Sequence, residues 1–346
     1  YWRGLVLSNY DGRTWRLENA PAEALPLLVP SGDEKSRYRY IVMLEPHNQR
    51  WLYALETMVE YEGQLAVTRE LQVLTRSNVI DVISYNMRSD IKAENKGLFE
   101  PERRKNLALP NGLNSESLGF ARGLFKDSNR DDRTYIGNVL KHFSEMGFKY
   151  TLSPPLLGEN AMDEFLFSTR RGFCEHFASA FVYLMRAAGI PSRVVIGYQG
   201  GAMHPFDDYM IVRQSDAHAW AEVWLDGEGW VRVDPTAAVS PTRIEEGIEH
   251  AGLERSLLPS ILISDNAIIQ RARFMWDSFH NSWNQWIVGY NRKRQQELLE
   301  MFGFNNASSS DLAMWLVVSM TLAGSLVAWL VIRRESIKQN DIIRLY

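Results

Sequence analysis

The chain has 346 residues, of which 45% are hydrophobic and 23% charged, values that exclude a disordered or collagen-like chain. Its 38 basic and 42 acidic side chains give a net charge of -4, which argues against a nucleic-acid-binding protein because phosphates require a basic surplus. The single cysteine, Cys174, excludes an intrachain disulfide and a CxxC metal site, so it is either a buried thiol or a nucleophile.

Residues 1–95 are predicted to form a β-rich N-terminal domain. Short β-branched or aromatic stretches alternate with turn signals such as Asp11-Gly12 and Glu62-Gly63, and this spacing is typical of a small antiparallel sandwich or barrel. We find no cluster of chemically active residues here, and we expect a module that packs or presents substrate. The predicted strands cover residues 2–7, 38–44, 51–56, 65–74 and 78–87.

Residues 96–129 are predicted to form a connector followed by a helix. The stretch 101–114 is polar and rich in turn residues, which is typical of a link between domains. Helical spacing of apolar residues then appears at 115–125 and again at 133–146. We interpret residues 130–245 as the domain that carries the chemistry.

Cys174 lies in the first turn of a predicted helix of about 15 residues. The N–H groups and the positive dipole end at a helix N-terminus favour a thiolate, and they can also hold an oxyanion beside the sulfur. Position alone leaves a nucleophile and a cysteine that fills a core gap as equal alternatives. The apolar residues that follow with helical period are Phe177, Ala178, Phe181, Leu184, Met185 and Ala188, before Gly189-Ile190-Pro191 ends the pattern.

A thiol nucleophile needs a base, and the base needs a group that orients it. Strict alternation in residues 216–225 predicts a strand that carries His218. Asp226-Gly227 predicts a type I′ hairpin after it. One bulged residue, for which Gly229 is the best candidate, then places Asp234 diagonal to His218 and on the same face, within reach of the imidazole.

The C-terminal part is predicted to cross a membrane. Residues 246–311 are predicted to form a helical connector whose stripe of aromatic residues either packs against the preceding domain or lies at the membrane interface. Residues 312–332 are an uncharged run long enough for a bilayer. Lys and Arg occur in residues 333–346 but not in the 17 residues before the run. The positive-inside rule therefore predicts a cytoplasmic tail at 333–346, with the catalytic domain outside the inner (cell) membrane. Because the chain begins with Tyr1 and not Met, we expect it to be part of a longer membrane protein.

Three motifs together resemble the transglutaminase-like superfamily: RGFCEHFASAFVYLMRAAGIPSRVVIGY, SDAHAWAEVWL and GWVRVDPT. The resemblance covers roughly residues 130–240 and implies an α+β fold with a papain-like core, in which a catalytic helix packs on an antiparallel sheet. It assigns the nucleophile to Cys174, the base to His218 and the carboxylate to Asp234. The β-rich N-terminal part and the following membrane helix make the whole chain similar to bacterial membrane-bound transglutaminase-like proteins of the TgpA type.

The resemblance implies acyl transfer through a thioester on Cys174, from glutamine side chains of proteins or peptides to amines outside the cytoplasm. No cofactor, metal or nucleic acid is expected, and the partners are the substrates, the lipid bilayer and unidentified components of the cell envelope. Two alternatives stay open. Water in place of the amine would make the protein a cysteine peptidase or amidase, and an inactive site would make it a cell-envelope scaffold.

His176 is expected to pack and not to act as the base, because residues at i and i+2 of a helix point apart. A zinc site formed by Cys174, His176 and His218 is disfavoured, since these residues lack the paired spacing of structural zinc ligands.

Other polar residues near the motifs receive structural interpretations. Glu222 is expected to be solvated, Tyr150 to pack in the core and Arg193 to form a structural ion pair. A loop before Tyr209 is expected to form a rim over the site and not a calcium site, because it lacks a calcium-loop pattern. Its polar residues are His204, Asp207 and Asp208.

Overall fold

The computed structural model describes residues 1–17, 30–63, 65–93, 97–205 and 207–241. Three predicted segments lie outside these residues: the helical connector 246–311, the membrane helix 312–332 and the tail 333–346. Within the described residues, no helix has both the length and the apolar character needed to cross a bilayer.

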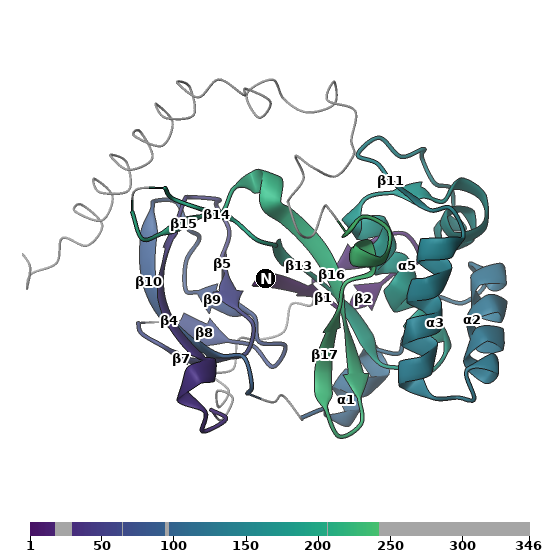
Figure 1. Ribbon diagram of the computed structural model, residues 1–346, viewed down its shortest axis with the longest axis horizontal. Helices are drawn as coiled ribbons and strands as arrows, with labels where there is room; N and C mark the ends of the chain where they lie inside the picture. Colours follow the sequence, from purple (N-terminus) through teal and green to yellow (C-terminus); the bar gives the residue numbers. More distant parts are fainter. Residues whose placement is uncertain (18–29, 64, 94–96, 206, 242–346) are drawn as a thin grey trace, which may run out of the picture. The chain divides into compact units, whose positions relative to one another are not determined.

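A five-stranded antiparallel sheet with the order β17-β16-β13-β1-β6 lies between the helices and the smaller sheets (Figure 1). Strand β1 comes from the N-terminal segment, yet it pairs with β13 in the same sheet as the strands of the predicted site. Gly197 permits this pairing, because a Cβ at that position would lie 1.9 Å from the carbonyl oxygen of Trp2. The strands are β1 (Trp2–Leu7), β6 (Ala54–Leu55), β13 (Ser192–Tyr198), β16 (Ala217–Leu225) and β17 (Gly229–Val233).

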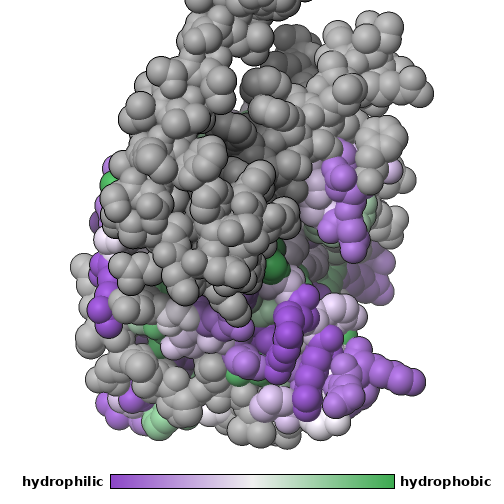
Figure 2. All heavy atoms as spheres, turned by 90° about the vertical axis from the view of Figure 1, so that its left-hand side faces the viewer, coloured by the Kyte–Doolittle hydropathy of each residue, from purple (hydrophilic) through white to green (hydrophobic). Residues whose placement is uncertain are grey.

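Most of the rest of the N-terminal segment, between residues 37 and 90, folds into small antiparallel sheets around a separate core that includes Leu52, Met58 and Met87. The predicted strand 65–74 is two short strands, because the chain turns at Leu71, whose φ is 61°. Figure 2 shows the side of the molecule on which these small sheets lie, and the residues that are coloured there are mostly hydrophilic. One of these sheets has the order β4 (Arg37–Leu44), β10 (Ile83–Asp90) and β7 (Met58–Tyr61), and the other has the order β5 (Trp51–Leu52), β9 (Val73–Thr75) and β8 (Leu65–Val67). Strands β2 (Asn9–Tyr10) and β3 (Trp15–Arg16) form a separate pair, whose Tyr10 and Trp15 pack in a second, larger hydrophobic core.

The larger helices lie on the side of the central sheet that faces away from the small sheets (Figure 1). The α-helices are α1 (Glu100–Lys105), α2 (Ser115–Asp127), α3 (Asp132–Glu145), α4 (Ala161–Asp163) and α5 (Cys174–Ala187), and a π-helical segment at Glu164–Thr169 follows α4. Short 3-10 helices occur at Glu34–Ser36, Gln214–Asp216 and Pro235–Ala238. Two strand pairs complete the described fold: β11 (Lys149–Tyr150) with β12 (Arg171–Gly172), and β14 (Ala202–Met203) with β15 (Met210–Ile211).

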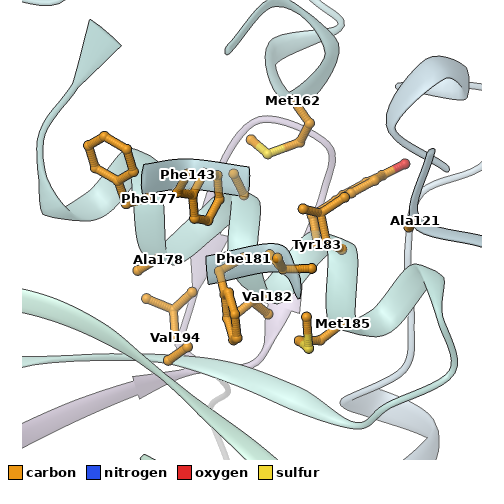
Figure 3. Packing of buried hydrophobic residues seen from close by; sticks show 14 of the residues in the cluster. Ala121, Phe143, Met162, Phe177, Ala178, Phe181, Val182, Tyr183, Met185 and Val194 are labelled. Atoms are coloured by element: carbon orange, nitrogen blue, oxygen red, sulfur yellow. The ribbon is translucent and has the colours of Figure 1, made fainter. Parts of the chain in front are cut away.

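Helix α5 lies in the largest hydrophobic core (Figure 3). Phe177, Phe181 and Met185 of this helix are fully buried, and each such side chain contributes roughly 1.5–3 kcal/mol. They share the core with one face of β16 and with Phe143 of α3. The predicted α+β arrangement of a helix packed on an antiparallel sheet is therefore confirmed, and the apolar stripe behind Cys174 is what holds the helix in place. The residues of that face of β16 are Ala219, Ala221, Val223 and Leu225.

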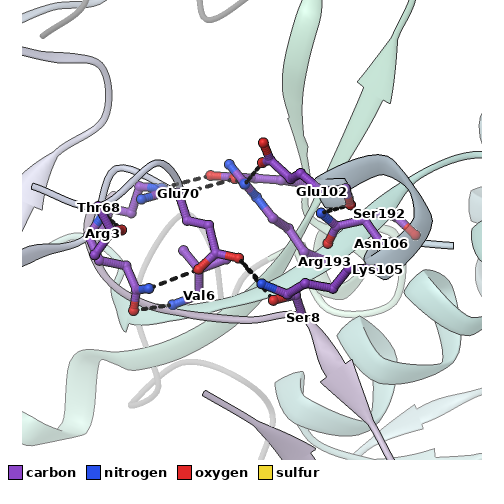
Figure 4. A network of polar contacts seen from close by, with 12 residues as sticks. Arg3, Val6, Ser8, Thr68, Glu70, Glu102, Lys105, Asn106, Ser192 and Arg193 are labelled. Carbon is purple, nitrogen blue, oxygen red and sulfur yellow. Dashed lines mark hydrogen bonds and ion pairs between the residues drawn. The ribbon is translucent and has the colours of Figure 1, made fainter. Parts of the chain in front are cut away.

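A buried polar network connects the N-terminal segment and α1 with the central sheet (Figure 4). Glu222 of β16 accepts hydrogen bonds from Arg3 of β1 at 2.9 Å and from Arg193 of β13 at 2.8 Å. Arg193 also contacts Glu102 of α1 at 3.3 Å. The expected ion pair of Arg193 is confirmed. The expected solvation of Glu222 is wrong, since β1 supplies Arg3 on this face and Glu222 is only 6% exposed.

Candidate active site

Cys174 is the first residue of α5 and is partly buried. The preceding Phe173 is extended, and its carbonyl oxygen accepts hydrogen bonds from the N–H groups of His176 and Phe177, which starts the helix. Gly172 leaves the necessary space, because a Cβ there would lie 2.6 Å from the Cβ of His176. The thiol thus lies at the positive end of a buried, rigid helix, which is a favourable place for a negative charge.

His218 and Asp234 form a buried pair. The Nε2 atom of His218 lies 2.7 Å from Oδ2 of Asp234, and the two side chains are 0% and 7% exposed. The pairing of β16 with β17 places Ala221 opposite Val233, so that the next residue, Asp234, lies diagonal to His218. This is the strand register that we predicted from a bulge at Gly229.

The turn that sets this register differs in detail from the predicted type I′ hairpin. Leu225 pairs with Gly229, and the N–H of Glu228 donates to the carbonyl oxygen of Leu225 at 3.1 Å. A type I′ turn needs positive φ at both central residues, but Asp226 is outside that region, whereas Gly227 and Gly229 have φ of 85° and 89°. The connection therefore has three residues, and Gly229 supplies the shift that brings Asp234 to the face of His218.

Burial and charge act in opposite directions on this pair. Burial lowers the pKa of His218, but the interactions with Asp234 and Cys174 outweigh it and raise this pKa to about 9. Burial raises the pKa of Asp234, but the hydrogen bond and the positive charge of His218 outweigh it and lower this pKa below its ordinary value. The imidazolium and the carboxylate are therefore both charged at neutral pH.

The two ring nitrogens of His218 have different surroundings. Nε2 is engaged by Asp234, while Nδ1 has no hydrogen-bond partner among the described residues. Because Cys174 is among the groups that raise the His218 pKa, the thiol and the imidazole are close enough to interact. Nδ1 is thus the nitrogen left to exchange a proton with the thiol, and a long thiol–imidazole contact is usual before substrate binds.

Tyr1 is a neighbour of the site that sequence reasoning missed. Its hydroxyl donates to Oδ2 of Asp234 at 2.8 Å, and its ring packs edge-on against Trp220 with a centroid distance of 5.2 Å. Only the pairing of β1 with β13 brings Tyr1 to this place. The available signal was weak: Tyr1 and Arg3 have the spacing of residues on one face of an extended segment, but nothing in the sequence identifies the strand with which this segment pairs.

The remaining candidates take structural positions. His176 packs against Phe173 at a centroid distance of 4.5 Å, as expected, and burial lowers its pKa. Tyr150 is partly buried and packs against the main core, also as expected. His204 is buried and stacks on Tyr209 at 4.7 Å. In the part of the chain that the structure describes, no three His, Cys, Asp or Glu side chains are grouped to hold a metal ion.

The structure brings together a thiol from α5, a charged imidazole from β16 and a carboxylate from Asp234, the residue after β17. A group of this kind can attack a carbonyl carbon, form a thioester and move a proton to the leaving group. Asp234 is also held from its other oxygen, since Oδ1 accepts the N–H of Thr236 at 2.9 Å. The carboxylate is therefore fixed in orientation before any substrate arrives.

Two family models match the chain. Residues 128–235 match the transglutaminase-like superfamily, and residues 1–94 match the TgpA N-terminal domain. The first match contains Cys174, His218 and Asp234, and the second contains Tyr1 and Arg3.

The chain is also similar to individual proteins. A Pseudomonas aeruginosa protein named protein-glutamine gamma-glutamyltransferase is 33% identical over 335 residues, which are 95% of this chain and 50% of that protein. The crystal structure of the periplasmic domain of TgpA from the same organism is 37% identical with a TM-score of 0.67, covering 72% of this chain and 86% of that domain. An uncharacterized Bacillus subtilis protein is 42% identical over 86 residues, 24% of this chain and 12% of that protein. The chain thus spans about half of the length of the Pseudomonas protein.

Proposed function

Because the chain belongs to the transglutaminase-like superfamily, and within it to the TgpA type, we propose that it acts as a protein-glutamine γ-glutamyltransferase. The observation that carries this proposal is the juxtaposition of Cys174, at a helix N-terminus, with the buried His218–Asp234 pair. The name of the Pseudomonas relative supports the choice of glutamine side chains as acyl donors.

In the first half-reaction, the Cys174 thiolate attacks the γ-carboxamide carbon of a glutamine side chain. The tetrahedral intermediate carries an oxyanion, which the N-terminal end of α5 can stabilise. The imidazolium of His218 then gives its proton to the departing nitrogen, the C–N bond breaks, and ammonia leaves. The products are a thioester on Cys174 and a neutral His218.

In the second half-reaction, an amine attacks the thioester carbon. Neutral His218 takes a proton from the attacking nitrogen, the C–S bond breaks, and the thiolate and imidazolium are restored. A lysine side chain as the amine gives an isopeptide bond between two proteins. The balance is one carboxamide and one amine converted into a substituted amide and ammonia.

Asp234 holds His218 in the productive orientation and stabilises its charged form. With Nε2 donating to Asp234 at 2.7 Å, proton exchange with the substrate is directed to Nδ1. Burial of both side chains strengthens this interaction, because competing water is excluded.

We further propose that the protein is anchored in the inner membrane with this site outside the cytoplasm. The uncharged run at 312–332 and the basic residues after it support this topology. A second support is the similarity to the periplasmic domain of TgpA.

Amine incorporation by the full chain tests the activity. The purified protein in detergent is incubated with a glutamine-containing peptide and a fluorescent primary amine, and both peptide labelling and ammonia release are measured. We expect both from the wild type and neither from Cys174→Ala, whose melting temperature should match the wild type because a thiol and a methyl differ little in volume.

The same assay separates transfer from hydrolysis. Ammonia release without labelling would mean that water accepts the acyl group and that the protein is an amidase. Equal activity in Cys174→Ala would refute a thioester on this residue. Labelling that requires Cys174 and rises with amine concentration would support the transferase.

A further inference from the structure

Tyr1 reaches the catalytic group from outside the segment that contains the other three residues. It lies directly before β1, and its hydroxyl donates to Oδ2 of Asp234 at 2.8 Å. The guanidinium carbon of Arg232 lies 3.9 Å from the centroid of the Tyr1 ring, and Arg232 in turn bonds to Glu56. Trp220 packs against the ring from β16. The phenol is therefore held by Asp234, Arg232 and Trp220, and Glu56 in turn holds Arg232.

Oδ2 of Asp234 is shared between two donors. His218 Nε2 approaches it at 2.7 Å and the Tyr1 hydroxyl at 2.8 Å, while Oδ1 binds the N–H of Thr236. Burial and the charge of Asp234 raise the pKa of Tyr1 far above its ordinary value, so the phenol stays protonated and remains a donor. A carboxylate with a second donor attracts the imidazolium less strongly than one that His218 holds alone.

Building on the function proposed above, we propose that Tyr1 is a positioning residue for the His218–Asp234 pair. Its hydroxyl holds Oδ2 of Asp234 and takes up part of the carboxylate charge, so that His218 can release its proton. An imidazolium whose proton is bound too tightly is a poor general acid, because catalysis is best when the acid is matched to the working pH. The pKa of His218, raised to about 9, is already above a neutral working pH, so a further rise would make His218 a poorer acid.

Several groups around His218 influence its charge, two of them directly and the others through Tyr1 or Asp234. Asp234 and Cys174 raise its pKa directly. The Tyr1 phenol acts through Asp234, whose pKa it lowers, and Arg232 and Glu56 act in opposite directions on Tyr1. Removing only the Tyr1 hydroxyl leaves Oδ2 with His218 as its single side-chain donor among the residues that the structure describes. The proton on His218 should then be held more tightly.

Tyr1→Phe isolates this effect, because the phenylalanine ring keeps the packing against Arg232 and Trp220. Tyr10→Phe is the matched control: it also removes a buried phenol, one that donates to the carbonyl oxygen of Gly12 and has no contact with the pair. Both variants are made in the full chain. The rate of alkylation of Cys174 by iodoacetamide is measured against pH, where the upper inflection reports loss of a proton from the interacting Cys174–His218 pair.

We expect Tyr1→Phe to move this inflection upward by about 0.5–1 pH unit, as the loss of one charge-assisted hydrogen bond implies. The kcat of amine transfer should fall by roughly 3–10-fold with little change in KM, since the loss affects proton release and not substrate binding. Tyr10→Phe should leave the inflection where it is in the wild type.

An inflection in Tyr1→Phe that is unmoved or lower would overturn the proposal, even if activity falls, because partial unfolding does not change the titration of molecules that remain folded. Alkylation needs no glutamine substrate, so the two proposals fail separately. A shifted inflection in a protein that incorporates no amine would remove the transferase assignment and leave the role of Tyr1 in place.

Discussion

Glu222→Gln removes the negative charge from the centre of a buried ion network. In the wild type, Oε1 and Oε2 of Glu222 accept from Arg3 at 2.9 and 3.1 Å, and Oε2 also accepts from Arg193 at 2.8 Å. Arg3 and Arg193 are 5% and 0% exposed. A glutamine has nearly the same shape, so the variant tests the charge and not the packing.

The expected loss follows from the pKa of Glu222. Burial would raise it, but the two guanidinium groups lower it from 4.5 to about 2. One pKa unit corresponds to about 1.4 kcal/mol, so ionised Glu222 contributes roughly 3 kcal/mol to stability at neutral pH. This agrees in size with the roughly 3–5 kcal/mol usually lost when one partner of a buried ion pair is removed.

The sign of the pH dependence also follows. Because folding lowers this pKa, the contribution is complete above pH 4.5 and is lost as the pH falls from 4.5 towards 2. The difference between wild type and Glu222→Gln should therefore be largest at neutral pH. At about pH 3.5 it should be smaller by more than about 1 kcal/mol.

Urea unfolding of the full chain in detergent, followed by tryptophan fluorescence at both pH values, measures this difference. Glu228→Gln is the control, since Glu228 pairs with Arg133 on the surface, where the side chains are 47% and 61% exposed. We expect the control to lose less than about 1 kcal/mol. A Glu222→Gln variant as stable as the control, or a difference that does not shrink in acid, would refute the assignment of Glu222 as a buried ionised group.

The other predictions concern the site itself. His218→Ala should abolish amine transfer, because no imidazole then exchanges protons with the thiol and the leaving nitrogen; transfer at the wild-type rate would mean that His218 is not the base. Asp234→Asn should lower kcat by at least about a hundredfold through a wrong imidazole tautomer, and an unimpaired variant would remove Asp234 from the mechanism. Transfer by the wild type should fall as the pH rises through about 9, where His218 loses the proton needed for ammonia release; a rate that keeps rising beyond this pH would contradict that role. A membrane-impermeant thiol reagent should label Cys174 on spheroplasts, with Cys174→Ala as the control; labelling only after the inner membrane is opened would reverse the topology.

Periodicity, together with an assumed bulge at Gly229, was enough to predict the local parts of the site. The apolar stripe from Phe177 to Met185 predicted α5, and the structure begins this helix at Cys174. Strict alternation predicted the strand of His218, and the assumption of one bulged residue at Gly229 predicted the position of Asp234. These features depend on residues close together in the chain, where the geometry of a helix or hairpin alone determines which side chains share a face.

Two features became visible only in the tertiary structure. Glu222 looked like a solvated residue on the polar face of a strand, and Tyr1 had no evident role. The pairing of β1 with β13 explains both, because it places Arg3 beside Glu222 and the Tyr1 hydroxyl within hydrogen-bond distance of Asp234. Every strand offers the same backbone N–H and C=O groups, so backbone hydrogen bonding alone does not determine which distant strand becomes the partner. The packing of the whole domain determines which strands pair. This pairing places a polar residue such as Glu222 in a buried network.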